Sequence, residues 1–545
     1  MVLSLKRVNS LQVEINNLEF KKEIFKYQDG CAGTDIYEYG RELEAREAQI
    51  AELRGRRDQL VSSLPRTEQM AFSSQQTRSF ISSLPSEILS SIFIKGPRHA
   101  RQRAMFVLTV SHVSRYWHAT AMQTPFLWSA IPILPWYTGT GYGQFLQILL
   151  QRSKSHPLDI AVTISEFDNP NSRVNQSWAI FQALRAANEP GSFPHNVPIH
   201  TRQPITAHRL QDQLSMFVPH VSRWRTFKYD CEALDDVFMV SALLANHSAP
   251  ILESFSLKLS TRMDGRNGNA FKTRIFKGGA PRLSYIDICG IHPFTCLPPL
   301  SSVTTLRLGT RPDKMSRDEL LDILRSCVTL ISLDIGDILR RRDLKGSMMV
   351  GITTLRSLSF SAYASPRYFI AGMLATIHCP AVESMSISPL PAWESPKDSP
   401  STHAAPLPPF LRLRSLRLIE IDCRKLARDF DFSSLPALHT IELRHCPDPM
   451  GLLCLLLRSV DKNDGIVWPE LRVIYLSHVG VKEISGIRRI IMHRSSRGRP
   501  IDTIIFDPVS LKKHWVDVEW MKQYVNVRQG EHVGYSMELS DFVFE

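Results

Sequence analysis

Two short segments of the sequence decide the fold: Leu355–Phe360 (LRSLSF) and Leu413–Leu418 (LRSLRL). In each segment an apolar anchor is followed by apolar residues three and five positions later, and polar residues lie between them. Successive side chains of a β-strand point to opposite faces, so the residues three and five after the anchor share one face. Each segment therefore predicts a strand with one apolar face toward a core and one polar face.

The same pattern recurs from Leu252 onward, with anchors 20 to 33 residues apart. This period is the length of one strand plus one helix or extended return, and it fits the strand segment of a leucine-rich repeat. Two weaker copies precede the series, at Trp128-Ile131-Ile133 and Trp224-Phe227-Tyr229. The clearest copies are Leu252-Phe255-Leu257, Leu283-Ile286-Ile288, Val303-Leu306-Leu308, Leu330-Leu333-Ile335, Leu355-Leu358-Phe360, Val382-Met385-Ile387, Leu413-Leu416-Leu418, Leu438-Ile441-Leu443, Leu471-Ile474-Leu476 and Ile501-Ile504-Phe506.

These copies predict a stacked array. One unit cannot cover its own apolar strand, whereas stacked units bury a continuous core and leave a curved parallel sheet accessible on one side. We expect an α/β solenoid, an irregular leucine-rich-repeat horseshoe over residues 216–545, whose polar sheet face binds a protein. An ordinary parallel α/β domain also alternates strands and helices, and it is the alternative interpretation.

Proline-rich stretches interrupt the repeats. Residues 389–410 contain seven prolines, too many for a strand or helix, so they should loop out between repeats. Residues 133–215 should lead into the array with a helix at 145–150, a strand at 158–164 and an insertion at 166–206. That insertion should hold at most one helix, near Trp178–Ala187.

The chain ahead of the repeats begins with an uncertain leader, residues 1–40, followed by a heptad pattern at residues 41–65. Its apolar residues are seven, three, seven and four positions apart, which is typical of a coiled-coil seam. Arginines occupy two seam positions and Pro65 ends the run, so a single solvated helix and a weak dimer are both possible interpretations. The seam residues are Leu43, Ile50, Leu53, Leu60 and Leu64.

Two further helices are predicted after residue 84. Pro85 suits a first helical turn, and Ile88, Leu89, Ile92 and Phe93 gather on one face of a short helix. A second helix is predicted because Phe106, Val110, Val113, Trp117 and Ala121 are spaced by four, three, four and four. About forty residues cannot bury this much apolar surface between themselves, so a partner or a neighbouring domain must cover the remainder.

Three motifs stand within residues 79–132: Leu84-Pro85-x-Glu87-Ile88-Leu89-x-x-Ile92-Phe93, Val110-Ser111-x-Val113-Ser114-Arg115-x-Trp117 and Thr124-Pro125-x-Leu127-Trp128-Ser129. Together they resemble an F-box, of the type present in large numbers in mushroom-forming fungi. The resemblance implies a three-helix module that docks on the Skp-type adaptor of an SCF-type cullin-RING ubiquitin ligase. His118, where the family often has arginine, and the basic loop at 95–103 depart from the family pattern.

The resemblance also assigns roles to individual residues. Six of them would contact the adaptor: Leu84, Pro85, Ile88, Leu89, Ile92 and Phe93. Three others would hold the helices together and edge the interface: Val110, Val113 and Trp117. The alternative interpretation is that all nine form a small core.

Composition limits the class of protein. A chain of 545 residues is too long for one compact core, and 43% hydrophobic with 22% charged residues is typical of globular proteins. Nine cysteines without a CxxC pair indicate a reducing compartment. Residues 119–151 carry no formal charge, but prolines and glycines interrupt them, so we reject a transmembrane helix. With no secretory signal in residues 1–20, a cytoplasmic or nuclear protein is expected.

No catalytic or metal-binding motif is found. GxxxxGK[ST], HExxH and GxSxG are all absent from the sequence, and the histidines show no metal-ligand spacing, so we expect neither an enzyme nor a cofactor. Cys327, Cys379 and Cys446 lie beside repeat strands, where a buried thiol packs well.

A cluster of arginines near residue 490 is the candidate target-binding site. The net charge of +12 is spread over the chain, but Arg488, Arg489 and Arg494 lie in a stretch without acids and suit an acidic or phosphorylated segment. A solvated convex helix is the alternative for this stretch. For the whole chain we expect a ligase substrate receptor, with an uncoupled repeat scaffold and an Arg-dependent nucleic-acid binder as the two alternatives.

Overall fold

The computed structural model describes residues 36–62, 84–97, 100–133, 140–163, 207–231, 233–259, 272–309, 315–336, 338–339, 349–362, 370, 372–374, 376–389, 410–430, 432, 435–457 and 467–530. The predictions for residues 1–35, for the insertion at 166–206 and for nearly all of the loop at 389–410 lie outside these ranges. The chain forms two compact units, Met1–Ile92 and Phe93–Glu545. The boundary falls inside the predicted F-box range.

The first unit contains helix α2 (Ile36–Ser62) and most of helix α4 (Ser86–Ile94). The predicted heptad helix is thus confirmed as a helix, beginning several residues earlier than expected. Ile50 and Leu53 of the seam are buried, and Glu52 and Arg56 form an exposed ion pair at 3.0 Å. Whether α2 pairs with a second helix stays a prediction.

The second unit begins with α5 (Ala100–Ser111) and α6 (Arg115–Gln123), where the apolar spacing predicted one continuous helix. That prediction is wrong because Ser114 adopts extended backbone and its hydroxyl accepts a hydrogen bond from the Trp117 amide at 3.2 Å. A serine at the N-cap satisfies an amide that has no intrahelical partner, so it starts a new helix. Val113 lies in the turn between the two helices and is 56% exposed, so it does not hold them together.

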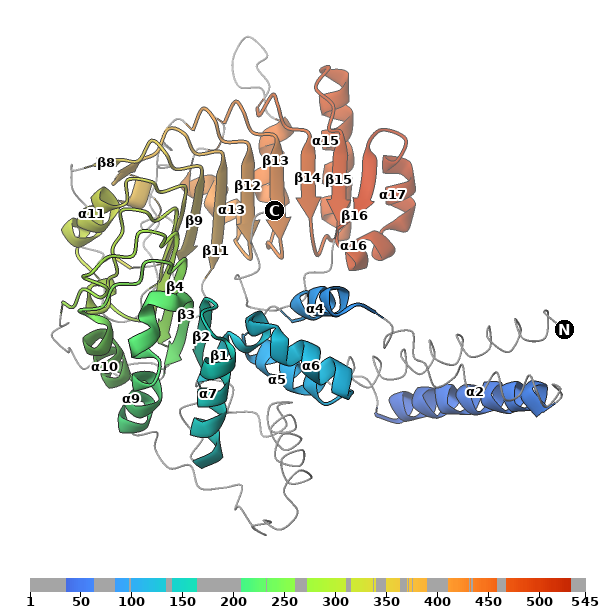
Figure 1. Ribbon diagram of the computed structural model, residues 1–545. Coiled ribbons are helices and arrows are strands. Elements are labelled where there is room, and N and C mark those ends of the chain that lie inside the picture. Colours follow the sequence, from blue (N-terminus) through green and yellow to red (C-terminus); the bar gives the residue numbers. More distant parts are fainter. Residues whose placement is uncertain are drawn as a thin grey trace. The chain divides into compact units, whose positions relative to one another are not determined.

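A parallel sheet of 14 strands forms the body of this unit, and Figure 1 shows the strands following one another in chain order from β1 to β16. All neighbouring strands within it are parallel. The strands are β1 (Ala130–Ile133), β2 (Leu158–Thr163), β3 (Trp224–Cys231), β4 (Ser254–Leu259), β5 (Tyr285–Cys289), β6 (Thr305–Gly309), β7 (Ser332–Gly336), β9 (Ser357–Ala362), β11 (Ser384–Pro389), β12 (Ser415–Ile419), β13 (Thr440–Arg444), β14 (Val473–Leu476), β15 (Thr503–Phe506) and β16 (Asn526–Gln529). A separate pair is formed by β8 (Val350–Gly351) and β10 (Ile377–His378).

Helices and short 3-10 turns connect the strands. Val240 and Leu244 of α10 (Leu234–Leu244) lie beside Trp224 and Phe227 of β3, on the apolar face of the sheet. The remaining connecting elements are η3 (Pro125–Trp128), α7 (Thr140–Arg152), α9 (Ala207–Ser215), η5 (Val218–Arg223), η6 (Pro293–Thr295), α11 (Arg317–Ser326), α13 (Cys423–Asp429), α14 (Met450–Leu453), η8 (Cys454–Leu457), α15 (Val481–Ser496), α16 (Pro508–Lys513) and α17 (Trp515–Met521). The unit is therefore an α/β structure built on one large parallel sheet.

The ten repeat copies each coincide with a strand, and their apolar residues are paired in register. Leu306 pairs with Leu333 and Leu333 with Leu358, so the residue three after each anchor forms one continuous ladder. These three leucines are at most 1% exposed. The weaker copies coincide with β1 and β3, and the predicted helix and strand at 145–150 and 158–164 coincide with α7 and β2. A shift of one residue would turn every apolar side chain to the opposite face, so burial fixes this register.

None of the described helices is both long enough and apolar enough to cross a membrane.

Candidate functional site

Helix α4 carries both buried and exposed members of the predicted adaptor-binding set. Ile88 and Ile92, four residues apart, are 50% and 51% exposed, whereas Leu89 is only 1% exposed. Leu84 is half-buried and Pro85 is exposed. Residues at i and i+4 of a helix lie on one face, so α4 presents two isoleucines together. The burial of Leu89 does not support its expected role as an adaptor contact.

Phe93, Val110 and Trp117 belong to the second unit, where Phe93 and Val110 are core residues and Trp117 is half-buried. The Phe93 ring lies 5.1 Å from the Trp117 ring and 6.3 Å from the Phe106 ring, between centroids. Phe93 is 2% and Val110 is 3% exposed. The expected contact of Phe93 with an adaptor is therefore not supported, while the expected packing role of Val110 and Trp117 agrees with their positions.

The second candidate site is the sheet face opposite the apolar ladder, which we call the polar face. It is defined by the residue four after each anchor, because strand alternation turns that residue away from the ladder. Neighbours in this row are paired directly across adjacent strands. The row runs Lys228, Ser256, Asp287, Arg307, Asp334, Ser359, Ser386, Arg417, Glu442 and Tyr475, and it ends at an apolar residue, Ile505.

Strands β4 to β7 carry a linear network of charges on the polar face. Lys258 Nζ lies 3.2 Å from Asp287 Oδ2, and Arg307 contacts Asp287 at 3.7 Å and Asp334 at 3.0 Å. Burial lowers the pKa of Arg307, but the two carboxylates outweigh it and raise the pKa above the ordinary value. Burial raises the pKa of Asp334 despite the pairing with Arg307. Each charge in this network has a partner of opposite sign.

The centre of the polar face is uncharged. Ser357, Ser359 and Ser361 of β9 lie beside Ser384, Ser386 and Ser388 of β11, strand against strand. The hydroxyl oxygens of Ser361 and Ser388 are 3.2 Å apart, so one hydroxyl donates a hydrogen bond to the other. Small hydroxyl side chains leave the sheet backbone close to the surface at this position.

Charged residues return on β12 and β13. Arg417 and Arg444 both donate hydrogen bonds to Glu442, which is buried. The Arg444 guanidinium also lies 5.0 Å from the centroid of the Tyr475 ring, in cation–π geometry. Burial raises the pKa of Tyr475. The two arginines are thus held by one carboxylate and one ring.

Sequence reasoning placed polar residues on this face but named none of them as site residues. The signal that identifies them was available: after each anchor, the fourth residue reads Asp287, Arg307, Asp334, Arg417 and Glu442 in five of the copies. Opposite charges on adjacent strands predict pairing across the sheet. These charged residues are spread over several copies, whereas the predicted site was the densest run of arginines in the sequence.

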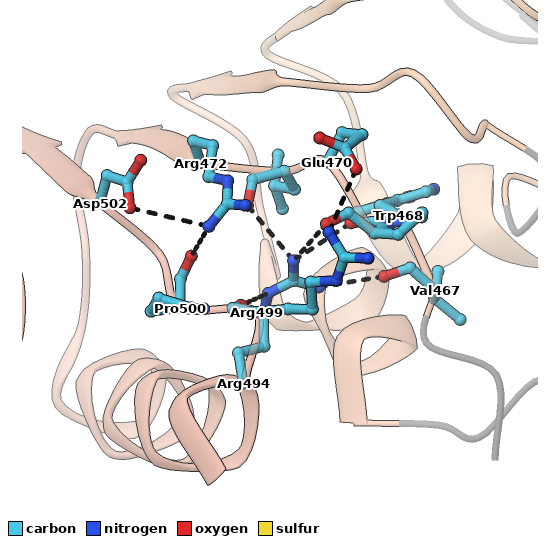
Figure 2. Close-up of polar contacts among 10 residues, drawn as sticks. Val467, Trp468, Glu470, Arg472, Arg494, Arg499, Pro500 and Asp502 are labelled. Carbon is cyan, nitrogen blue, oxygen red and sulfur yellow. Dashed lines mark hydrogen bonds and ion pairs between the residues drawn. The ribbon is translucent and has the colours of Figure 1, made fainter. Parts of the chain in front are cut away.

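Arg494, expected to bind a target, is a core residue and its predicted role is wrong. Its side chain is fully buried, and Figure 2 shows the guanidinium surrounded by backbone carbonyl oxygens of the turn that precedes β14. It donates to the carbonyls of Val467 at 3.1 Å, Trp468 at 3.2 Å and Leu471 at 3.3 Å, while Nε donates to that of Arg499 at 3.0 Å. Burial lowers the pKa of Arg494 to about 10.

The other two arginines of the expected site differ from Arg494 and from each other. Arg488 pairs with Asp517 of α17 at 3.0 Å, and its guanidinium lies 4.2 Å from the Trp520 ring centroid. Arg489 is exposed. The stretch without acids in the sequence therefore gains acids from distant segments, since Glu470 also pairs with Arg499 at 3.3 Å (Figure 2). The three arginines do not form one phosphate-binding cluster.

The cysteines expected to pack in the core are buried. Cys327, Cys379 and Cys446 are 3%, 4% and 7% exposed. Burial raises the pKa of Cys327 and Cys379 to about 12, so both are protonated near neutral pH. Within the described ranges, no three residues among the histidines, cysteines and acids are grouped so as to hold a metal ion.

No protein-family model matches this chain, and no curated protein matches it.

Proposed function

We propose that this protein is the substrate-recognition subunit of an SCF-type cullin-RING ubiquitin ligase, in which α4 docks on the Skp-type adaptor. The observation that carries the proposal is the exposure of Ile88 and Ile92 on α4, directly after the Leu84-Pro85 motif. Two half-exposed isoleucines on one face of a nine-residue helix lose contact with water when a partner covers them.

The sheet of the second unit is proposed to be an irregular leucine-rich-repeat solenoid. The strand order supports this interpretation, because each strand pairs with the preceding and the following repeat throughout the sheet. An open doubly wound α/β domain instead reverses its strand order at a switch point. In a solenoid every repeat contacts only its neighbours, which is what the in-register apolar ladder requires.

In this proposal the polar face binds the target protein, and the ligase modifies that target. Holding a target lysine near the ubiquitin-carrying enzyme replaces a bimolecular encounter with an almost intramolecular one. The receptor then contributes geometry and needs no reactive group of its own. The residues that would contact the target are those of the polar face, in place of Arg494.

The test is a binding titration of purified adaptor with the wild-type protein and the variant Ile88→Asp/Ile92→Asp. We expect the variant to lose roughly 100-fold in affinity, since truncation of central interface residues commonly costs several kcal/mol. Val328→Asp is the control, because Val328 is an exposed apolar residue of the other unit. The variant Leu84→Ala/Pro85→Ala tests the motif itself.

Absence of adaptor binding by the wild-type protein would refute the proposal and leave a repeat scaffold without a ligase. The nucleic-acid alternative has less support, because Arg494 is buried and Arg488 is paired with Asp517. A steep salt dependence of binding to generic nucleic acid, lost in Arg488→Ala/Arg489→Ala, would revive it.

A further inference from the structure

A buried carboxylate connects helix α5 to the first strands of the sheet. Asp159 of β2 accepts a hydrogen bond from Arg103 Nη1 of α5 at 2.9 Å. Its other oxygen accepts from Arg225 Nε of β3 at 2.9 Å and from the Thr226 hydroxyl at 3.1 Å. One side chain therefore joins three elements of the second unit. Sequence reasoning missed it because Arg103 and Asp159 are 56 positions apart.

The surroundings of this carboxylate exclude most water. The side chains of Asp159 and Arg103 are 10% and 12% exposed, so the pair is screened far less than a surface ion pair. The Arg103 guanidinium also lies 4.6 Å from the centroid of the Phe126 ring of η3. The hydrogen bond that Arg225 donates to Asp159 raises the pKa of Arg225, which keeps that guanidinium charged.

A second set of contacts connects α6 to η3, the turn that leads directly into β1. Trp128, fully buried at the end of η3, donates its indole N–H to the Ala121 carbonyl of α6 at 2.8 Å. The Arg152 guanidinium of α7 covers the Trp128 ring at 4.4 Å from its centroid. Helix α5 is thus attached to β2 through a charged contact, and α6 is attached to η3 through the Trp128 side chain.

We propose that Arg103 and Asp159 are positioning residues that fix the direction of α5 and α6 relative to the sheet, and thereby decide which lysines the ligase modifies. The inference rests on the proposed function, in which the box end of the chain is bound to the ligase and the sheet presents the acceptor. Effective concentration depends on a fixed geometry, because small misplacements of reacting groups lower rates strongly. If the direction of α5 varied, the acceptor lysines would occupy many positions relative to the ligase.

Arg103→Met is the most informative variant. It removes the ion pair between α5 and β2 but leaves Asp159 paired with Arg225, so no buried charge loses all its partners. Methionine also retains a flexible apolar stem that packs on Phe126. Asp159→Asn is harsher, because two arginines then face each other without a carboxylate. Arg103→Lys restores one charge and should recover part of the effect.

The experiment uses the full chain in a reconstituted ligase with purified adaptor, cullin-RING complex and ubiquitin-charged enzyme, and with the receptor's own lysines as acceptors. Peptide mass spectrometry compares the modification of Lys154, beside β2, with that of the exposed lysines of the last repeats, Lys482, Lys512, Lys513 and Lys522. Arg356→Met is the control, because it removes a more exposed ion pair, with Glu383, between two neighbouring repeats of the same sheet.

We expect Arg103→Met to bind adaptor as the wild-type protein does, and to change the ratio of modification between the two lysine groups by about tenfold. The modification ratio of Arg103→Lys should lie between those of the wild type and Arg103→Met, and the ratio of Arg356→Met should equal that of the wild type. An unchanged ratio in Arg103→Met, at equal adaptor binding and equal folded fraction, would overturn the positioning role alone. Failure of the wild-type protein to bind adaptor would instead refute the proposed function, and the inference with it. If Arg356→Met shifts the modification ratio as much as Arg103→Met does, the cause is a general loss of stability, and the positioning role is overturned.

Discussion

Helices α4 and α15 were both predicted to bind a partner, but their predicted binding residues differ in exposure. Helix α4 keeps Ile88 and Ile92 half-exposed although both are apolar. Helix α15 buries Arg494 completely although it is charged. Residue type alone therefore does not identify a binding surface. What matters is whether the residue's own chain already satisfies it, with carbonyl oxygens for an arginine or with packing for an isoleucine.

The sharpest test of this comparison is Arg494→Met. The substitution removes the donors for several carbonyls of the turn before β14, and buried acceptors without donors are costly. We expect a loss of about 3 kcal/mol in the free energy of unfolding. Urea denaturation followed by circular dichroism measures it, with Arg489→Met as a control that should change little. A loss no greater than that of the control would mean that Arg494 is dispensable to the fold.

The next test contrasts two neighbours on α4. Leu89 is 1% and Ile88 is 50% exposed, so Leu89→Ala should cost about 2 kcal/mol and Ile88→Ala about 0.5 kcal/mol. Thermal unfolding of the two variants compares them directly. Equal costs would imply that Ile88 is also packed, and the apolar face proposed for the adaptor would then disappear.

Helix α11 extends the comparison to an acid that its own chain satisfies. Burial opposes ionisation of Glu319, but hydrogen bonds from Ser316 and the contact with Lys272 lower its pKa from 4.5 to about 2. A lowered folded pKa contributes stability that is complete above pH 4.5 and is lost as the pH falls toward 2. We expect a loss of about 1 kcal/mol over that interval after solvent screening. Denaturation at several pH values measures it, and the part due to this residue should be missing in Glu319→Gln.

The smallest effect is expected for Arg488, in the middle of α15. The side chains of Arg488 and Asp517 are 42% and 31% exposed, so their pairing resembles a surface ion pair. A double-mutant cycle with Arg488→Met and Asp517→Asn should give a coupling of about 0.5 kcal/mol. A coupling energy as large as the loss of stability in Arg494→Met would contradict the expectation that the buried arginine of this helix contributes more to stability than the exposed one.

Local patterns predicted much of the fold. Spacings of three and five residues located the strands and their buried faces, and Leu306, Leu333 and Leu358 pair as those spacings require. The same reasoning failed at Ser114, where one capping hydroxyl divides a regular apolar stripe into two helices. It also failed at Arg494, whose partners at 467–471 are more than twenty positions away.

The sequence by itself determined which residues form strands and which of their faces is apolar, because the alternation of side chains along a strand is a local property. Only the tertiary structure decided which charged residues remain at a surface. Asp159, Arg103 and Arg494 are satisfied by groups that stacking of the repeats and helices brings near them. The energy of a charge depends on those neighbours and on the water they displace, and neither is written in the local sequence.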